Sequence, residues 1–148
     1  MAFATGYLAA PQKVGAGEVY GTNNTILASD TFENGLLVGR FAKLDTGSID
    51  NLDASVTPVI AGVVKRNVAS PIEDGAAIDS ALFDTVSFVR NGLVTVEVKA
   101  GQTPVKFGAV TAHNVADADA GKALATGGVA TGYEFIEEVS TNVWLINK

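Results

Sequence analysis

The chain has 148 residues, of which 47% are hydrophobic and 18% charged, and it carries a net charge of -6 and no cysteine. This length suits a single domain that buries a sizeable core without disulfides, and the lack of cysteine excludes thiol catalysis and thiolate metal sites. The negative charge without a Lys/Arg cluster argues against nucleic-acid binding, and no apolar run approaches the roughly 20 residues of a membrane span, so neither a nucleic acid nor a membrane is an expected partner.

Residues 1–28 contain four glycines and a proline but show no sustained strand or helix periodicity, which predicts an extended N-terminal arm. Aromatic and aliphatic side chains are spread along this arm, whereas disordered tails usually contain few aromatic residues. They are the expected contacts with the arm's own domain or with another chain: Phe3, Tyr7, Leu8, Val19 and Tyr20. The start of the arm lacks the basic region of a signal peptide, so use without secretion is expected.

The remaining residues, 29–148, are expected to form one β domain. Residues 36–44 (LLVGRFAKL) follow the turn signal Glu33-Asn34-Gly35 and have strand composition. A second strand is expected at 58–68, where Gly62 indicates a bulge or a close approach of two backbones. The Asp-rich stretch 46–57 is expected to be a loop, and 70–82 a short helix or turn.

The clearest strand pattern lies at residues 86–98 (VSFVRNGLVTVEV), which are dominated by β-branched and apolar side chains. Val94, Val96 and Val98 alternate with polar residues, so one face is expected to build the core. Asn91-Gly92 readily takes the positive φ angles of a tight turn. The run therefore forms either a two-stranded hairpin or one strand with a kink.

The C-terminal part is predicted to alternate turns and short strands. A turn is expected at 100–103, a strand at 104–111, loops at 112–131, and a hairpin of strands 133–139 and 143–146 with Trp144 as an anchor. The six or seven expected strands indicate an all-β domain, either a small antiparallel β-sandwich or a barrel.

Residues with catalytic potential are few. His113 is the sole histidine and has no nucleophile motif beside it, so a solvated loop residue is the better interpretation. Two Asp-rich loops lack the spacing of an EF-hand: Asp45, Asp50 and Asp53 in one, Asp117 and Asp119 in the other. The glycines at 15–21 are not spaced as in a dinucleotide fingerprint, and a bend in the arm is expected there. No catalytic, cofactor-binding or metal-binding residue is predicted, and the protein is not expected to be an enzyme.

The order of several short segments resembles that of the structural cement, or capsid decoration, proteins of tailed bacteriophages. These segments are Gly6-Tyr7 with Pro11 and Gly15, then residues 37–41 (LVGRF), 60–64 (IAGVV) and 89–96 (VRNGLVTV), and finally Ala100-Gly101 followed by Pro104-Val105. One departure is Gln102-Thr103, where many relatives have an acidic residue after the Ala-Gly turn.

The resemblance implies a small, mainly β, non-enzymatic protein that binds the outside of an assembled lattice of major capsid protein as a dimer or trimer. The expected location is the outer surface of the virion, after synthesis in the host cytoplasm, and no cofactor is implied. A jelly-roll-like barrel and a smaller β-tulip are both compatible with it. The alternative interpretation is a β-sandwich module that binds a ligand or glycan through Trp144, Tyr133 and Tyr20, and a small hydrolase built on His113 is a third.

Overall fold

The computed structural model describes residues 15–54, 57–66 and 77–148, and within these ranges the protein is all-β, without a helix. The strands are β1 (Val19–Ser29), β2 (Leu36–Leu37), β3 (Phe41–Asp45), β4 (Ser48–Asn51), β5 (Val59–Val64), β6 (Ala77–Ile78), β7 (Val86–Glu97), β8 (Ala109–Ala112), β9 (Ala123–Leu124), β10 (Val129–Ser140) and β11 (Val143–Asn147). The predicted all-β class is confirmed. The described residues also contain no helix long and apolar enough to cross a membrane.

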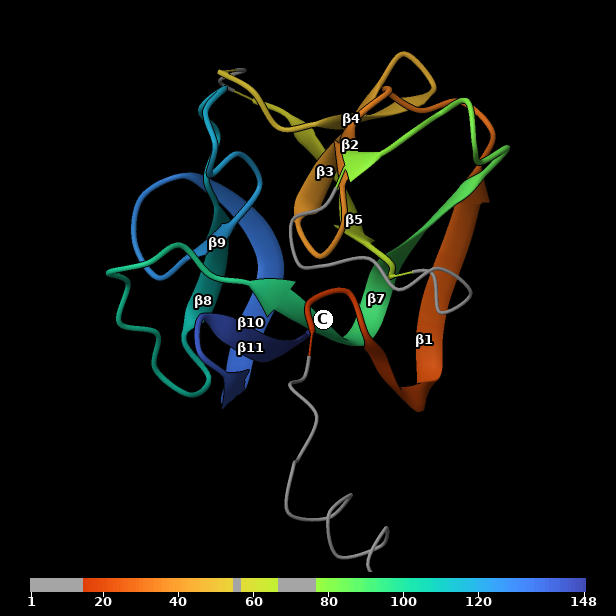
Figure 1. The fold of residues 1–148 in the computed structure, drawn as a ribbon. Helices are drawn as coiled ribbons and strands as arrows, with labels where there is room; N and C mark the ends of the chain where they lie inside the picture. Colours follow the sequence, from red (N-terminus) through yellow and green to blue (C-terminus); the bar gives the residue numbers. More distant parts are fainter. Residues whose placement is uncertain (1–14, 55–56, 67–76) are drawn as a thin grey trace, which may run out of the picture.

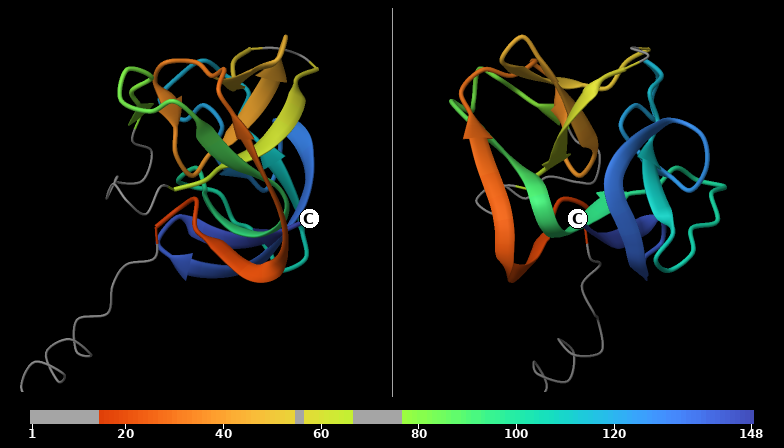
Figure 2. Two further views of the ribbon diagram at one scale, coloured as in Figure 1. Left: turned by 90° about the vertical axis from the view of Figure 1, so that its right-hand side faces the viewer. Right: turned by 180° about the vertical axis from the view of Figure 1, so that it is seen from behind.

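Nine of these strands form one antiparallel sheet in the order β4-β3-β5-β7-β11-β10-β8-β9, with β1 added beside β7, while β2 and β6 form a separate ribbon. The sheet does not stay flat. It curls into a half-barrel, so that β8 to β11 lie on one side of β7 and β3 to β5 on the other (Figure 1). The orange strand β1 faces the viewer in the left-hand view of Figure 2, and in the right-hand view it lies at the left side of the molecule, next to β7.

Strand β7 is the centre of this arrangement because it pairs with three strands. β1 runs along one edge, whereas β5 pairs at Phe88 and Val89, and β11 pairs at residues 93–97. Asn91-Gly92 lies between these two zones, and Gly92 has a φ of 117°. The expected hairpin or kink is therefore a kink inside one long strand.

The core consists of two clusters, one on each side of the curled sheet. The larger cluster contains two edge-to-face ring pairs, Phe41 with Tyr133 at 5.5 Å and Phe135 with Trp144 at 5.4 Å between centroids. The alternating valines at the end of β7 and just after it belong to this cluster, as their pattern predicted: Val94, Val96 and Val98. The smaller cluster joins the β2–β6 ribbon to the N-terminal half of β7 through Leu36, Val38, Ile78, Val86 and Phe88, among others.

Gly62 occupies the close backbone approach that the sequence indicates. Its φ is 149°, and a Cβ at this position would overlap the carbonyl oxygen of Val89. The register of β3 and β5 shifts here, from Ala42 opposite Gly62 to Lys43 opposite Ile60. This shift is a bulge of the predicted kind.

Several expected boundaries are wrong. The expected loop 46–57 contains β4, because Thr46 and Gly47 take positive φ angles and close a hairpin that buries Ile49. Residues 104–108 form a turn rather than the start of a strand, and β9 lies within the expected loops. Residues 77–82 contain β6 and a turn rather than a helix, and 70–76 lie outside the described residues.

Candidate functional site

The first Asp-rich loop is organised around a lysine. Lys43 Nζ lies 2.8 Å from a carboxylate oxygen of Asp53 and 3.9 Å from one of Asp45. The hydrogen bond with Asp53 raises the pKa of the Lys43 ammonium above its ordinary value. Asp50 instead accepts a hydrogen bond from Ser48 at 2.7 Å. The Lys43 ammonium thus neutralises part of this acidic cluster. In the described ranges, no group of acidic or His side chains is arranged to hold a metal ion.

His113 has a structural partner rather than full exposure to solvent. Its Nε2 lies 3.0 Å from one oxygen of Asp117 and 3.1 Å from the other, and its side chain is 12% exposed. Asp117 also accepts a hydrogen bond from the N–H of Asp119 at 2.8 Å. The hydrogen bond from His113 holds the pKa of Asp117 below its ordinary value. These contacts fold the 113–119 loop onto itself.

A partly buried ion network, which the sequence pattern did not reveal, ties this loop to the sheet. Arg40 is 7% exposed, and its Nε lies 3.0 Å from Glu97 at the end of β7. One terminal guanidinium nitrogen of Arg40 donates to the carbonyl oxygens of Ala118 at 2.7 Å and Ala120 at 3.3 Å. Lys122 lies 3.3 Å from Glu97 and 2.7 Å from Asp119. Three segments far apart in sequence are thereby held together.

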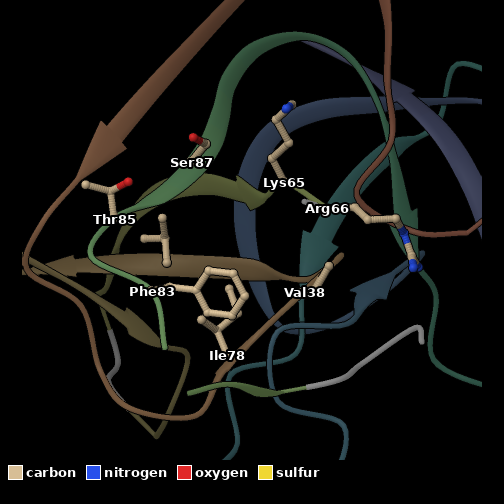
Figure 3. Close-up of a pocket in the computed structure, with 8 residues that line it drawn as sticks. Val38, Lys65, Arg66, Ile78, Phe83, Thr85 and Ser87 are labelled. Carbon is tan, nitrogen blue, oxygen red and sulfur yellow. The ribbon is translucent and has the colours of Figure 1, made fainter. Parts of the chain in front are cut away.

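A pocket of about 180 Å³ borders the smaller core cluster, of which Val38, Ile78 and Val86 line it (Figure 3). Lys65 and Ser87 lie at one side of it, and the Phe83 ring lies over Ile78 at the other. Arg66 Nε donates to the carbonyl of Ala16 at 3.1 Å. The residues known to line this pocket supply hydroxyl groups and cations but no carboxylate, imidazole or thiol. Among the described residues that line it, the pocket therefore has neither an acid–base pair nor a set of metal ligands.

The glycine-rich stretch at 15–21 is fixed to the sheet where it enters the described structure. Gly17 N–H donates to the carbonyl of Thr95 at 2.7 Å, and the Thr95 hydroxyl donates to the carbonyl of Gly15 at 2.8 Å. Ala16 between them is fully buried and lies against Gly39. This part of the expected arm is a turn anchored on β7.

The residues expected to make intermolecular contacts divide as follows. Phe3, Tyr7 and Leu8 lie outside the described residues. Val19 packs partly buried against the larger core cluster, whereas Tyr20 is 38% exposed, and both are on β1. Burial is the main cause that raises the pKa of the Tyr20 hydroxyl. Their roles in binding stay predictions.

The aromatic residues considered for stacking on a ligand are mostly internal. Tyr133 is 3% exposed, and its hydroxyl donates to the carbonyl of Val89 at 2.8 Å. Burial raises the pKa of this hydroxyl far above its ordinary value. Trp144 is partly buried against Phe135. Of these three aromatic side chains, Tyr20 alone is well exposed. A glycan needs exposed rings to stack on, so this burial weakens the alternative of a glycan-binding module.

Exposed apolar side chains lie close together in sequence at two places that the sequence analysis did not single out as contacts. On β1, Ile26 is 43% and Leu27 39% exposed. On the loop before β8, Val105 and Phe107 are each 66% exposed. Nothing in the sequence except its aromatic residue type indicated that Phe107 would be exposed, because the apolar pattern placed it within the expected strand 104–111. Surfaces of this kind suit contact with other proteins.

Comparison with known proteins identifies the family. The chain matches the family model described as XM1 gp53 minor capsid protein over residues 3–147. It is similar to a chain of the solved structure described as "The capsid of Myoviridae Phage XM1", with 37% sequence identity, a TM-score of 0.87, and coverage of 99% of this chain and 97% of that chain. No curated protein matches it. The chain therefore belongs to the XM1 gp53 minor capsid protein family and is a structural component of a phage capsid.

Proposed function

We propose that this protein binds the outer surface of the assembled major capsid protein lattice as a dimer or trimer, and that it cements the mature head by bridging neighbouring capsid subunits. The observation that carries the proposal is the match over almost the whole of both chains to a protein of the XM1 phage capsid.

Cementing does not need a strong single contact. A bound oligomer engages several capsid subunits at once, so the effective concentration of each further contact is high and avidity builds from modest interfaces. An interface of roughly 800 Å² per partner is sufficient for each copy. Ligands that bind only the assembled lattice stabilise it by mass action, which counteracts the pressure of packaged DNA.

The loop before β8 has the properties of a contact point for the capsid. Phe107 has a φ of 67°, an unfavourable conformation for an aromatic residue. Main-chain bonds to β10 hold it there, since Phe107 N–H donates to the carbonyl of Phe135 at 2.7 Å and the N–H of Phe135 donates to the carbonyl of Gly108 at 2.9 Å. The loop thus presents Val105 and Phe107 outward, and their burial would contribute about 1–2 kcal/mol each.

The test is reconstitution with expanded capsids that lack the protein. Purified full-length chain is added over a concentration series, and the particles are sedimented and imaged by cryo-electron microscopy. Saturable binding with density that follows the lattice on the outer surface is expected. Capsids that remain bare at saturating concentration would refute the proposal.

A truncation tests the contribution of the arm. Because Gly15 and Gly17 are bonded to Thr95 on β7, the deletion must end at residue 14 to leave the fold intact. Removal of residues 1–14, with Phe3, Tyr7 and Leu8, is expected to weaken capsid binding while the thermal unfolding midpoint changes little. Unchanged affinity of the truncated chain would remove the arm from the proposal.

A further inference from the structure

The main-chain groups on the outer edge of β1 can be placed from the register of its neighbours. Lys65 N–H donates to the carbonyl of Ser87 at 2.8 Å, so the main-chain groups of Ser87 point to the β5 side of β7. These groups alternate in direction along a strand, so those of Phe88 point to β1, where Leu27 is the paired residue. Leu27 therefore bonds to β7.

The same alternation directs the N–H and C=O groups of Ile26 and Ala28 away from β7. In the ranges that the structure describes, β7 is the one strand paired with β1, so this outer edge is open. The ribbon views show it along the side of the molecule (Figure 2). An open edge presents a row of hydrogen-bonding groups to any strand that approaches.

This edge lacks the side chains that usually prevent strand addition. Residues Val19–Ser29 include no charged residue and no proline, and most of them are exposed. Ile26 and Leu27 are adjacent and point to opposite faces of the ribbon, yet both are exposed. The irregular pairing before Ile26 confines the regular part of the edge to residues 26–29. A short, apolar, unprotected edge of this kind is suited to a partner strand.

We propose that the partner is β1 of a second copy of this chain, which adds in antiparallel orientation about a two-fold axis at Leu27. This inference rests on the proposed self-association and specifies its geometry. A two-fold axis at Leu27 places Ile26 of each copy opposite Ala28 of the other copy. Both residues present their main-chain groups to the open edge, so each pair exchanges two hydrogen bonds, and the two Leu27 side chains meet on one face.

The charge pattern favours a second copy as the occupant. Each copy has a net charge of -6, so most surfaces of two copies repel each other, but this strand carries no charge. The nearest carboxylate that follows the strand, Asp30, lies beyond the regular part of the edge, so no charged side chain falls within the proposed contact at residues 26–29. The contact is isologous, because the same patch serves both copies.

A single cysteine tests the axis directly, since the chain has none of its own. Residues that face each other in a non-hydrogen-bonded antiparallel pair have Cα atoms about 4.5 Å apart, within the range of a disulfide. Leu27→Cys is therefore expected to form a covalent dimer under mild oxidation at least about tenfold faster than Leu82→Cys, measured on non-reducing gels. Leu82 is a matched control because it is an exposed leucine, 76% accessible, outside β1.

The cross-linking is performed on the full chain in solution and on decorated capsids. Equal rates for the two variants in both settings would overturn the proposal, and so would a trimer in which residue 27 has no two-fold mate. Ala28→Pro removes an outward N–H without breaking a bond to β7, and it is expected to lower the fraction of dimer at least tenfold in sedimentation experiments. Capsid binding without a Leu27→Cys cross-link would refute this geometry alone, whereas cross-linking without capsid binding would refute only the proposed function.

Discussion

Replacement of Arg40 by Met is expected to destabilise the fold strongly, although Met matches the aliphatic stem of the arginine side chain. Arg40 bonds to Glu97 at 3.0 Å and to the carbonyls of Ala118 and Ala120 at 2.7 and 3.3 Å. Met fills most of the space of the Arg stem but donates no hydrogen bond. The variant thus removes three polar contacts from a site that is almost closed to water.

The magnitude follows from these contacts. Hydrogen bonds of a charged group contribute roughly 1.5–3 kcal/mol each. Glu97 keeps Lys122 at 3.3 Å, so the full penalty of about 3–5 kcal/mol for an orphaned buried charge does not apply. The three contacts share one guanidinium group, so their contributions do not add, and we expect a net loss of about 3 kcal/mol in the free energy of unfolding. For a domain of this size that loss corresponds to a decrease of about 6–12 °C in Tm.

Urea unfolding followed by circular dichroism measures the loss, with Arg90→Met as the matched control. Arg90 is an exposed arginine on β7, so the same substitution there is expected to change the stability by less than about 0.5 kcal/mol. A loss below about 1 kcal/mol in Arg40→Met, or equal losses in the two variants, would refute the reasoning.

Three further variants probe other features. Gly62→Ala is expected to cost about 3 kcal/mol in urea unfolding, because the added Cβ overlaps the carbonyl of Val89. Phe107→Gly is expected to maintain stability or raise it by up to about 1 kcal/mol, because it relieves the positive φ, while it weakens capsid binding in sedimentation. Asp117→Asn is expected to lower Tm at about pH 6 but not at about pH 2.5. The hydrogen bond from His113 lowers the folded-state pKa of the Asp117 carboxyl, so the ionised carboxylate stabilises the fold above its ordinary pKa of 3.8. This stabilisation is lost as the pH falls through the folded-state pKa.

Each of these variants has a control or a contrary result. Gly47 has a φ of 83° with open space around it, so Gly47→Ala is expected to cost only about 1 kcal/mol, and an equal cost at both glycines would contradict the overlap at Gly62. Full capsid affinity of Phe107→Gly would exclude Phe107 as a contact. A decrease in Tm of Asp117→Asn that is the same at both pH values would rule out the ionic contribution.

The parts of the fold that could be predicted are those with a strong local pattern. The alternating valines of β7, the C-terminal hairpin and the close approach at Gly62 all reflect residues whose local chemistry fixes the backbone. Strand β1 gave no such pattern because it is exposed on both faces, so its side chains do not alternate between apolar and polar types. Strand β4 could not be predicted from the sequence because its one buried residue, Ile49, is surrounded by polar residues.

The candidate surfaces and the ion network were less accessible to prediction for a different reason. Arg40 meets Glu97 across 57 positions of sequence and Ala118 across 78, so the network exists only after the sheet has curled. The outward position of Phe107 depends on main-chain bonds to β10 rather than on its neighbours in sequence. Period-based analysis detects neither kind of contact, whereas the order of short segments along the chain indicated the capsid family correctly.

The proposed stabilisation of the phage head is tested by a comparison of heads with and without the protein. Heads packaged with DNA are heated in a dye-access assay that reports release of the genome, first lacking the protein and then after addition of the purified chain. If the protein bridges capsid subunits, its addition is expected to raise the temperature of DNA release by several degrees, and the effect is expected to saturate with binding. Equal release temperatures for bare and fully decorated heads would contradict it.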